Sequence, residues 1–272
     1  MEIKDRVALV TGGASGIGHA VSLELAERGV KAIAMVDLTD NVEDAAKQIN
    51  AEVDANIVIP FKGNVTDENF RHDVFKKMRK DHGVVNICIP AAGITRDSLA
   101  VKIDKETHKA DIYSIENFRL VVEVNLIAPV YWAMEMIANL AEDRAQRGLK
   151  KWYADEGIQG TVVFIGSISS QGNKGQVSYA STKAGLEGAA ATLTKETIFH
   201  GVRCAVIHPG FTDTPMVRAM GDEYIEKYIL PDTQLGRLIR PKEIADAICF
   251  MVSNSAVSGE LWADAGWHPS PA

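Results

Sequence analysis

The sequence is poor in cysteine and has no excess of positive charge. Its 272 residues contain three cysteines, Cys88, Cys204 and Cys249, which lie in apolar runs without metal-ligand spacing. This pattern predicts buried free thiols in a reducing compartment and no bound metal. The formal net charge of −7 argues against nucleic acid or an anionic membrane as a partner, because both bind basic surfaces. Small molecules are the expected partners.

Long hydrophobic runs are also missing from the sequence. We find no stretch that approaches the roughly 18 consecutive apolar residues needed to span a bilayer. The N-terminus reaches the charged cluster Lys4-Asp5-Arg6 before its first apolar run, unlike a secretory signal. We therefore expect a cytoplasmic protein with no membrane partner.

The apolar runs that do occur are short and rich in β-branched residues: VALVTGG, IAMVDL, NIVIPFKGN, VNICIPAAG, GTVVFIGS and RCAVIHPG. They are continuous, as in strands that are buried on both faces. Candidate helices lie between them, at Gly16 to Arg28, Val42 to Glu52, Glu68 to Lys80, Phe118 to Arg147, Ser181 to His200 and Lys242 to Asn254. This alternation predicts an α/β fold with a doubly wound parallel sheet and helices on both faces. We find no composition break, so we expect a single domain over residues 1–272.

Two charged segments, at about residues 102–117 and 141–157, interrupt the alternation. We interpret both as solvated surface extensions. The alternative for the second is that Trp152 and Tyr153, which lie among charged residues, contact another subunit.

A glycine-rich turn follows the first strand, Val7 to Val10, and leads into a helix. It reads Thr11-Gly-Gly-Ala-Ser-Gly-Ile-Gly18. Glycines at such a turn let backbone N–H groups approach a pyrophosphate and let the helix pack closely on the strand. The turn therefore predicts a dinucleotide site that includes Gly12, Ser15, Gly16, Ile17 and Gly18.

An acidic residue, Asp37, ends the second strand about 20 residues after these glycines. Its carboxylate can accept hydrogen bonds from both ribose hydroxyls of NAD. It would repel the 2′-phosphate of NADP by up to about 4 kcal/mol per unit charge at 4 Å and an effective dielectric constant near 20. We expect NAD as cofactor; the alternative is a carboxylate that only caps a turn. Strand-end positions place Asn64, Val65, Ala91, Ala92 and Gly93 at the adenine and ribose.

The candidate catalytic residues are Ser167, Tyr179 and Lys183. Tyr179 and Lys183 are one helical turn apart, and Ser167 ends the strand twelve residues before Tyr179. Hydride transfer between an alcohol and nicotinamide needs a group that takes or returns the hydroxyl proton. We expect Lys183 and the nicotinamide charge to lower the phenol pKa of Tyr179 by about two to three units from about 10. Ser167 would bind the substrate oxygen.

Taken together, TGGASGIG, the Ser-Tyr-x-x-x-Lys set and PGFTDTPM resemble the classical short-chain dehydrogenase/reductase family, from Val7 to Gly266. The segments AGITRDSL, GNKGQVSYASTKAG and LGRLIRPKEIADAICFM are similar to 3-oxoacyl-[acyl-carrier-protein] reductases. The resemblance implies a single-domain Rossmann fold and a homotetramer or homodimer. It also implies that Asn125 relays protons from Lys183 through a water. Lys183 would bind the nicotinamide ribose together with Tyr179. A further segment would close on the nicotinamide: Pro209, Gly210, Thr212 and Thr214.

The resemblance further implies a substrate lid at about residues 211–235. Within it, Met216 to Leu230 would be mobile, and Met220, Tyr224 and Tyr228 would either line an apolar pocket or only pack the helix. Ser169 is a less favoured substitute for Ser167. Basic residues that could receive a phosphopantetheine arm are Arg96, Arg218 and Arg237.

The chain also departs from the family pattern. Pro90 and Ala91 stand where the family commonly has two asparagines, and Asn64 stands in place of an aspartate. The biosynthetic reductases typically use NADPH, whereas Ser15 and Asp37 favour NAD. We therefore expect an NAD(H)-dependent oxidoreductase for a secondary alcohol and a ketone. The substrate is either a 3-oxoacyl thioester, on acyl-carrier protein or CoA, or a free secondary or cyclic alcohol; a non-catalytic dinucleotide sensor is the remaining alternative.

Overall fold

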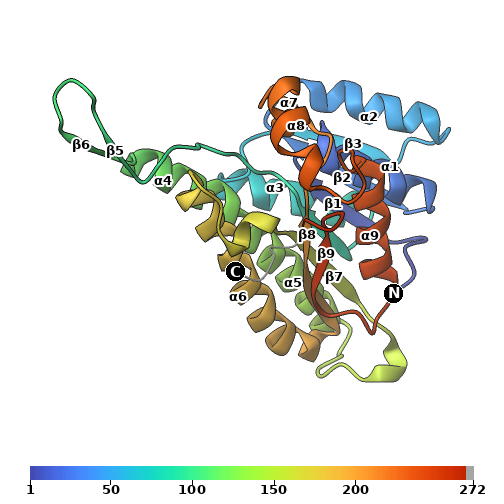
Figure 1. The fold of residues 1–272 in the computed structure, drawn as a ribbon. Coiled ribbons are helices and arrows are strands. Elements are labelled where there is room, and N and C mark those ends of the chain that lie inside the picture. The colour runs from blue at the N-terminus through green and yellow to red at the C-terminus, as the bar shows by residue number, and fades with distance from the viewer. Residues whose placement is uncertain (268–272) are drawn as a thin grey trace.

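The computed structural model describes residues 1–267, and its centre is a seven-stranded parallel sheet (Figure 1). The strand order is β3-β2-β1-β4-β7-β8-β9. This arrangement confirms the predicted doubly wound α/β fold. The strands are β1 (Val7–Thr11), β2 (Ala32–Asp37), β3 (Val58–Lys62), β4 (Ile87–Pro90), β7 (Gly160–Ile165), β8 (Val202–Pro209) and β9 (Gly259–Ala263).

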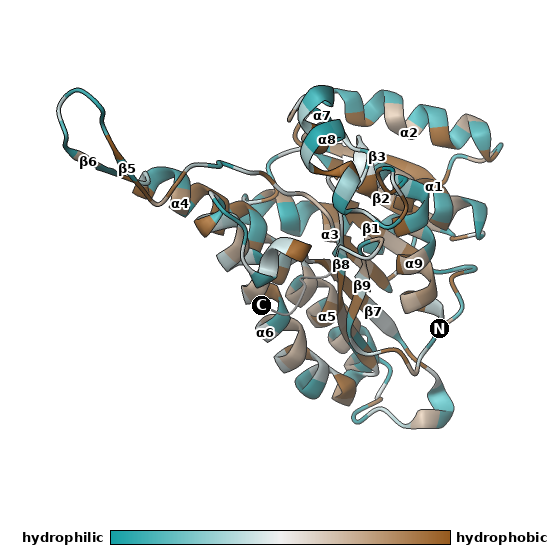
Figure 2. Ribbon diagram, viewed as in Figure 1, coloured by the Kyte–Doolittle hydropathy of each residue, from teal (hydrophilic) through white to brown (hydrophobic). Residues whose placement is uncertain are grey.

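Helices cover both faces of the sheet because alternate strand residues point to opposite sides. Ala8 and Val10 pack with α1 (Gly16–Glu27), α2 (Asn41–Glu52) and α9 (Pro241–Ser253). Val7 and Leu9 pack with α3 (Glu68–Asp81), α5 (Ala128–Gln146) and α6 (Val177–Thr197). Figure 2 shows the result, with apolar strands between helices of mixed hydropathy.

The long helix expected at Phe118 to Arg147 is divided. It consists of α4 (Ile115–Val122), a π-helical turn (Glu123–Ile127) and α5. Contrary to the expectation that no segment is apolar and long enough, Ile115–Gln146 could cross a membrane by length and composition alone. However, Trp132 and Met136 are fully buried in the core of the domain. We therefore interpret α5 as a core helix.

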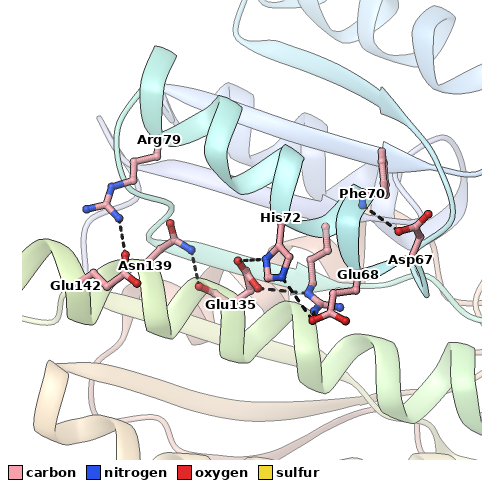
Figure 3. A network of polar contacts seen from close by, with 9 residues as sticks. Asp67, Glu68, Phe70, His72, Arg79, Glu135, Asn139 and Glu142 are labelled. Carbon is pink, nitrogen blue, oxygen red and sulfur yellow. Dashed lines mark hydrogen bonds and ion pairs between the residues drawn. The ribbon is translucent and has the colours of Figure 1, made fainter.

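Helices α3 and α5 are joined along their outer edge by polar contacts (Figure 3). The imidazole of His72 lies 2.7 Å from a carboxylate oxygen of Glu135, and this hydrogen bond raises the pKa of His72. Arg79 donates to Glu142 at 3.0 Å. These contacts keep α3 beside α5 at the rim, where the apolar core ends.

The first charged insertion forms a hairpin of β5 (Val101–Ile103) and β6 (Ala110–Ile112) that projects from the body of the molecule (Figure 1). Val101 pairs with Ile112 and Ile103 with Ala110, so these four side chains share one face. Ile112 is 74% exposed and Ile103 61%. The insertion is thus an extension, as expected, but it carries an apolar face that its charged composition did not indicate.

The second insertion folds back on its own chain. Helix α5 ends at Gln146, within the insertion. Arg144 is buried and binds both carboxylate oxygens of Glu156, at 2.7 and 3.1 Å. Trp152 donates its indole N–H to Gly157 and is partly buried, whereas Tyr153 is exposed. Of the two aromatic residues considered for a subunit contact, Tyr153 is therefore the accessible one.

Trp132 anchors the loop after β3, and its replacement by Phe should destabilise the protein. Its indole N–H donates to the carbonyl of Val65 at 2.8 Å in a buried site. The substitution Trp132→Phe leaves that carbonyl without its donor, at a cost of roughly 1–3 kcal/mol. Urea unfolding of this variant, with the exposed Tyr131→Phe as control, measures the effect. Equal unfolding midpoints for the two variants would contradict this assignment.

Candidate active site

The strand order reverses between β1 and β4, and a cavity opens there at the carboxyl ends of the strands. In open α/β sheets this crevice is where ligands bind. The cavity has a volume of about 430 Å³. The expected cofactor residues that line it are Gly12, Ser15, Gly16, Ile17, Gly18, Asp37, Asn64, Val65, Ala91, Ala92, Gly93, Tyr179, Lys183 and Thr214.

The glycine turn is packed too tightly for side chains. A Cβ added to Gly18 would lie 2.2 Å from the carbonyl oxygen of Gly12. Gly12 itself has φ +66°, and a Cβ there would lie 2.8 Å from Cα of Ala92. The glycines therefore leave the backbone without side chains where it faces the cavity at the start of α1. Close approach of a pyrophosphate requires such a backbone. These residues fit a dinucleotide.

Asp37 lies at the cavity wall and also organises the turn around it. One carboxylate oxygen accepts from the N–H of Ala14 at 3.1 Å. The other accepts from the N–H and the hydroxyl of Thr39, at 3.1 and 3.0 Å. The two interpretations of Asp37, a turn cap and a cavity carboxylate, thus apply together. Sequence reasoning missed Thr39, which also lines the cavity.

A second cavity of about 170 Å³ adjoins the first, and Tyr179 lines both. Ser167 lies in the second cavity with Tyr179, and its side chain acts to lower the pKa of the phenol. Its hydroxyl oxygen also accepts from the N–H of Ser169 at 3.1 Å. The hydroxyl of Ser169 instead donates to Gln176 at 2.8 Å. Ser167, rather than Ser169, is therefore the serine next to the phenol.

Lys183 lies one turn after Tyr179 on α6, with its ammonium 5.3 Å from the phenol ring centre. It donates to the carbonyl of Ile165 at 2.7 Å, which anchors α6 to the end of β7. Burial lowers the pKa of Lys183 to about 8. The sequence places these two residues on one helical face, and the structure brings both to the first cavity.

Our expectation of a lowered pKa for Tyr179 rests partly on the nicotinamide charge, and the protein atoms alone raise this pKa. Burial raises it to about 12, the side chain of Ser167 opposes this change, and the charge of Asp97 adds to it. Desolvation penalises a phenolate strongly in an enclosed site. Tyr179 is therefore a protonated phenol over the neutral pH range. Asp97, which lines the second cavity, was missed by sequence reasoning.

Asn125 is fully buried in the π-helical turn and lines neither cavity. Its side-chain oxygen accepts from the N–H of Ile94 at 2.9 Å, and its amide donates to the carbonyl of Ile94 at 2.8 Å. The side chain thus fixes the loop after β4. The proton relay from Lys183 through a water, which the resemblance implies for Asn125, stays a prediction that these contacts do not test.

The expected nicotinamide segment is divided between the cavities. Pro209, Gly210 and Thr212 line the second cavity, and Thr214 lines both. Beyond them the lid contains α7 (Pro215–Arg218) and α8 (Asp222–Tyr228). Met216, Val217 and Met220 line the second cavity.

Of the two alternatives for Tyr224 and Tyr228, the structure favours helix packing over pocket lining. Neither lines the second cavity; their rings pack on each other with centres 5.0 Å apart, and they are 47% and 52% exposed. Within α8 the buried residue is Ile225, while Tyr224 and Tyr228 are exposed.

Two of the three candidate arginines are neutralised by acids. Arg218 binds Asp213 at 2.6 Å and Asp222 at 2.9 Å, and Arg237 binds Glu243 at 2.7 Å. Arg96 donates to the carbonyl of Thr95. Of the three, Arg96 is the one whose charge is not shared with a carboxylate in the contacts of residues 1–267.

Comparisons with known proteins agree with this geometry. A family model described as short chain dehydrogenase matches residues 6–225. The chain is similar to 3-oxoacyl-[acyl-carrier-protein] reductase FabG of Escherichia coli (strain K12), with 34% identity over 266 residues that cover 96% of each chain. It is 31% identical over 258 residues to 3-oxoacyl-[acyl-carrier-protein] reductase of Rattus norvegicus, covering 94% of this chain and 95% of that one.

The fold is similar to that of a solved structure, a short-chain type dehydrogenase/reductase from Mycobacterium marinum. The TM-score is 0.82 at 22% identity, and the match covers 98% of this chain and 96% of the other. The chain belongs to the short-chain dehydrogenase/reductase family. It is an oxidoreductase that acts on CH–OH groups with a nicotinamide dinucleotide.

A methyl group at Gly18 should weaken dinucleotide binding, since the glycine turn would have to shift. Overpacking of this kind costs about 1–3 kcal/mol, and each 1.4 kcal/mol is tenfold in Kd. We expect Gly18→Ala to raise the NADH dissociation constant by roughly tenfold or more, measured by fluorescence titration. Gly188→Ala is the control, because a Cβ there meets nothing within 4 Å. Equal affinity of the two variants would show that the turn does not bind the dinucleotide.

Proposed function

We propose that the protein is an NAD(H)-dependent reductase of 3-oxoacyl thioesters. The observation that carries this proposal is the position of Tyr179. Its phenol lines both the cavity with the glycine turn and the smaller cavity with Ser167. A proton donor at this junction can serve a substrate carbonyl beside a dinucleotide.

The raised pKa of Tyr179 favours reduction at neutral pH. With a pKa of about 12, the phenol keeps its proton and can give it to the ketone oxygen. Ser167 would hold that oxygen by a hydrogen bond as negative charge develops on it. Lys183 would bind the nicotinamide ribose beside Tyr179. The bound dinucleotide supplies the hydride.

The thioester substrate is supported by the names of the relatives and by Arg96 near the smaller cavity, whose wall includes Thr95 and Asp97. A specific observation favours the alternative, a free secondary or cyclic alcohol. The smaller cavity has a volume of about 170 Å³, and the charges of Arg218 and Arg237 are neutralised by acids. Such a site suits a compact uncharged molecule.

We also propose that the protein is a cytoplasmic homotetramer or homodimer with a single domain over residues 1–272, of which 268–272 lie outside the described residues. The cysteines are buried free thiols, as suits a reducing compartment. Support for an oligomer comes from large apolar side chains that are exposed along α4, the π-helical turn and α5: Leu120, Ile127, Tyr131 and Met134.

The first test is reduction of acetoacetyl-CoA by NADH, beside a panel of simple and cyclic ketones. We expect brisk turnover of the thioester by the wild type and a loss of several orders of magnitude in Tyr179→Phe, because the proton donor is missing. NADH binding should be almost unchanged in this variant, which shows that it is folded.

Two serine variants provide a matched control. Ser167→Ala should lose much of the activity, and Ser169→Ala should retain most of it. Turnover of free ketones alone would favour the alternative substrate class. Full activity of Tyr179→Phe would remove Tyr179 from the chemistry.

The preference for NADH should depend on Asp37. We expect the wild type to favour NADH over NADPH by roughly a hundredfold in kcat/KM, because its carboxylate repels a 2′-phosphate. Asp37→Ser should lower that ratio by roughly tenfold or more. Asp40→Ser, which changes an exposed carboxylate three residues further on, should leave it unchanged. A wild type that prefers NADPH would overturn the assignment.

A further inference from the structure

Three side chains that neither cavity uses meet behind the catalytic serine. His208 on β8, Glu187 on α6 and Glu260 on β9 each direct one donor atom to a common point, and these atoms all lie within 4.8 Å of one another. Nε2 of His208 is 3.4 Å from a carboxylate oxygen of Glu260 and 3.8 Å from one of Glu187. From this geometry we propose that the three residues form a binding site for a divalent transition metal, with zinc as the representative ion.

Two of these donor atoms are buried without a hydrogen bond. His208 has no exposed surface, and neither its Nε2 nor Oε1 of Glu187 is hydrogen-bonded to any of residues 1–267. Buried polar atoms in folded proteins are nearly always satisfied. A cation between the imidazole and the two carboxylates would satisfy both atoms.

The distances suit the ion. Zinc binds imidazole nitrogen and carboxylate oxygen at about 2.0–2.2 Å, which places two ligand atoms of a tetrahedral site about 3.3 Å apart. The observed separations of 3.4 and 3.8 Å need only small side-chain movements. Two carboxylates and a neutral imidazole carry a charge of −2, which a divalent cation balances.

The other side of the imidazole faces the backbone of Ser167, where a carbonyl is within reach of Nδ1. A metal-binding histidine donates its second ring N–H to a carboxylate or a backbone carbonyl, which fixes the ring and its tautomer. Nδ1 of His208 lies 3.1 Å from the carbonyl oxygen of Ser167 and 3.3 Å from the backbone nitrogen of Ser167, whose N–H can donate to it. Binding of the ion requires the tautomer in which Nδ1 carries the proton and donates to the carbonyl. The indole of Trp262 stacks on the ring with centres 4.2 Å apart. Nε2 is thereby left to face the two carboxylates.

The proposed ion has a structural role. None of its three ligands lines either cavity, so it would not touch the substrate. It would instead join α6, β8 and β9 directly behind Ser167. Glu260, whose side chain is 40% exposed, provides access from solvent and leaves room for a water as fourth ligand.

The test is zinc retention by the full chain, freed of any affinity tag. The protein is treated with EDTA, equilibrated with zinc chloride, dialysed and analysed for metal. We expect about one zinc per chain and a higher melting temperature with zinc. Glu260→Gln should lose the retained zinc, whereas Glu196→Gln, which changes an exposed glutamate on α6, the helix of Glu187, should keep it.

Cobalt(II) provides a second measurement, because its visible absorption reports coordination by protein ligands. The spectrum should appear in the wild type and disappear in Glu187→Gln and His208→Gln. If His208→Gln does not fold, the two glutamate variants decide the question. Zinc retention that is absent in the wild type, or equal in Glu260→Gln and the wild type, would overturn the proposal and leave the cluster as an ion pair of the protein alone.

Discussion

The contact between Gly18 and the carbonyl of Gly12 is the constraint on which the site depends. Because a Cβ at Gly18 would lie 2.2 Å from that oxygen, the first turn of α1 can rest directly against the end of β1. This contact places the start of the helix at the point where the strand order reverses. Asp37 then fixes the turn from the neighbouring strand through the N–H of Ala14. The floor of the larger cavity is therefore made of backbone, and its walls are made of the side chains that end the other strands.

Burial, rather than pairing of charges, determines the pKa values of Tyr179 and Lys183 beside the glycine turn. The expectation that Lys183 would lower the phenol pKa treats the two groups as if solvent surrounded them. In the structure both are buried, and desolvation shifts each toward its neutral form, the phenol for Tyr179 and the amine for Lys183. The same surroundings that disfavour a phenolate keep a proton available for a carbonyl oxygen.

The sequence was sufficient to predict the parts of the molecule that short-range patterns determine. Continuous apolar runs predicted the parallel sheet, and residues at the ends of those runs, such as Asp37 and Ser167, predicted the wall of the site. Sequence patterns did not predict the features that depend on packing between segments far apart in the chain. The π-helical turn shifts the phase of the helix between α4 and α5, so a single periodicity did not describe it. Tyr224 and Tyr228 are exposed, whereas Ile225 is buried. Glu187, His208 and Glu260 are far apart in the sequence, and no spacing rule would join them.

Helix α6 connects the two cavities with the cluster of Glu187, His208 and Glu260. Tyr179, Lys183 and Glu187 follow one another at intervals of four residues, a row of about 12 Å at 1.5 Å rise per residue. The helix holds the phenol of Tyr179 at one end of this row and the carboxylate of Glu187 at the other. A rotation of the helix would move all three groups in concert, so the position of the phenol at the two cavities is tied to Glu187, a side chain that lines neither of them.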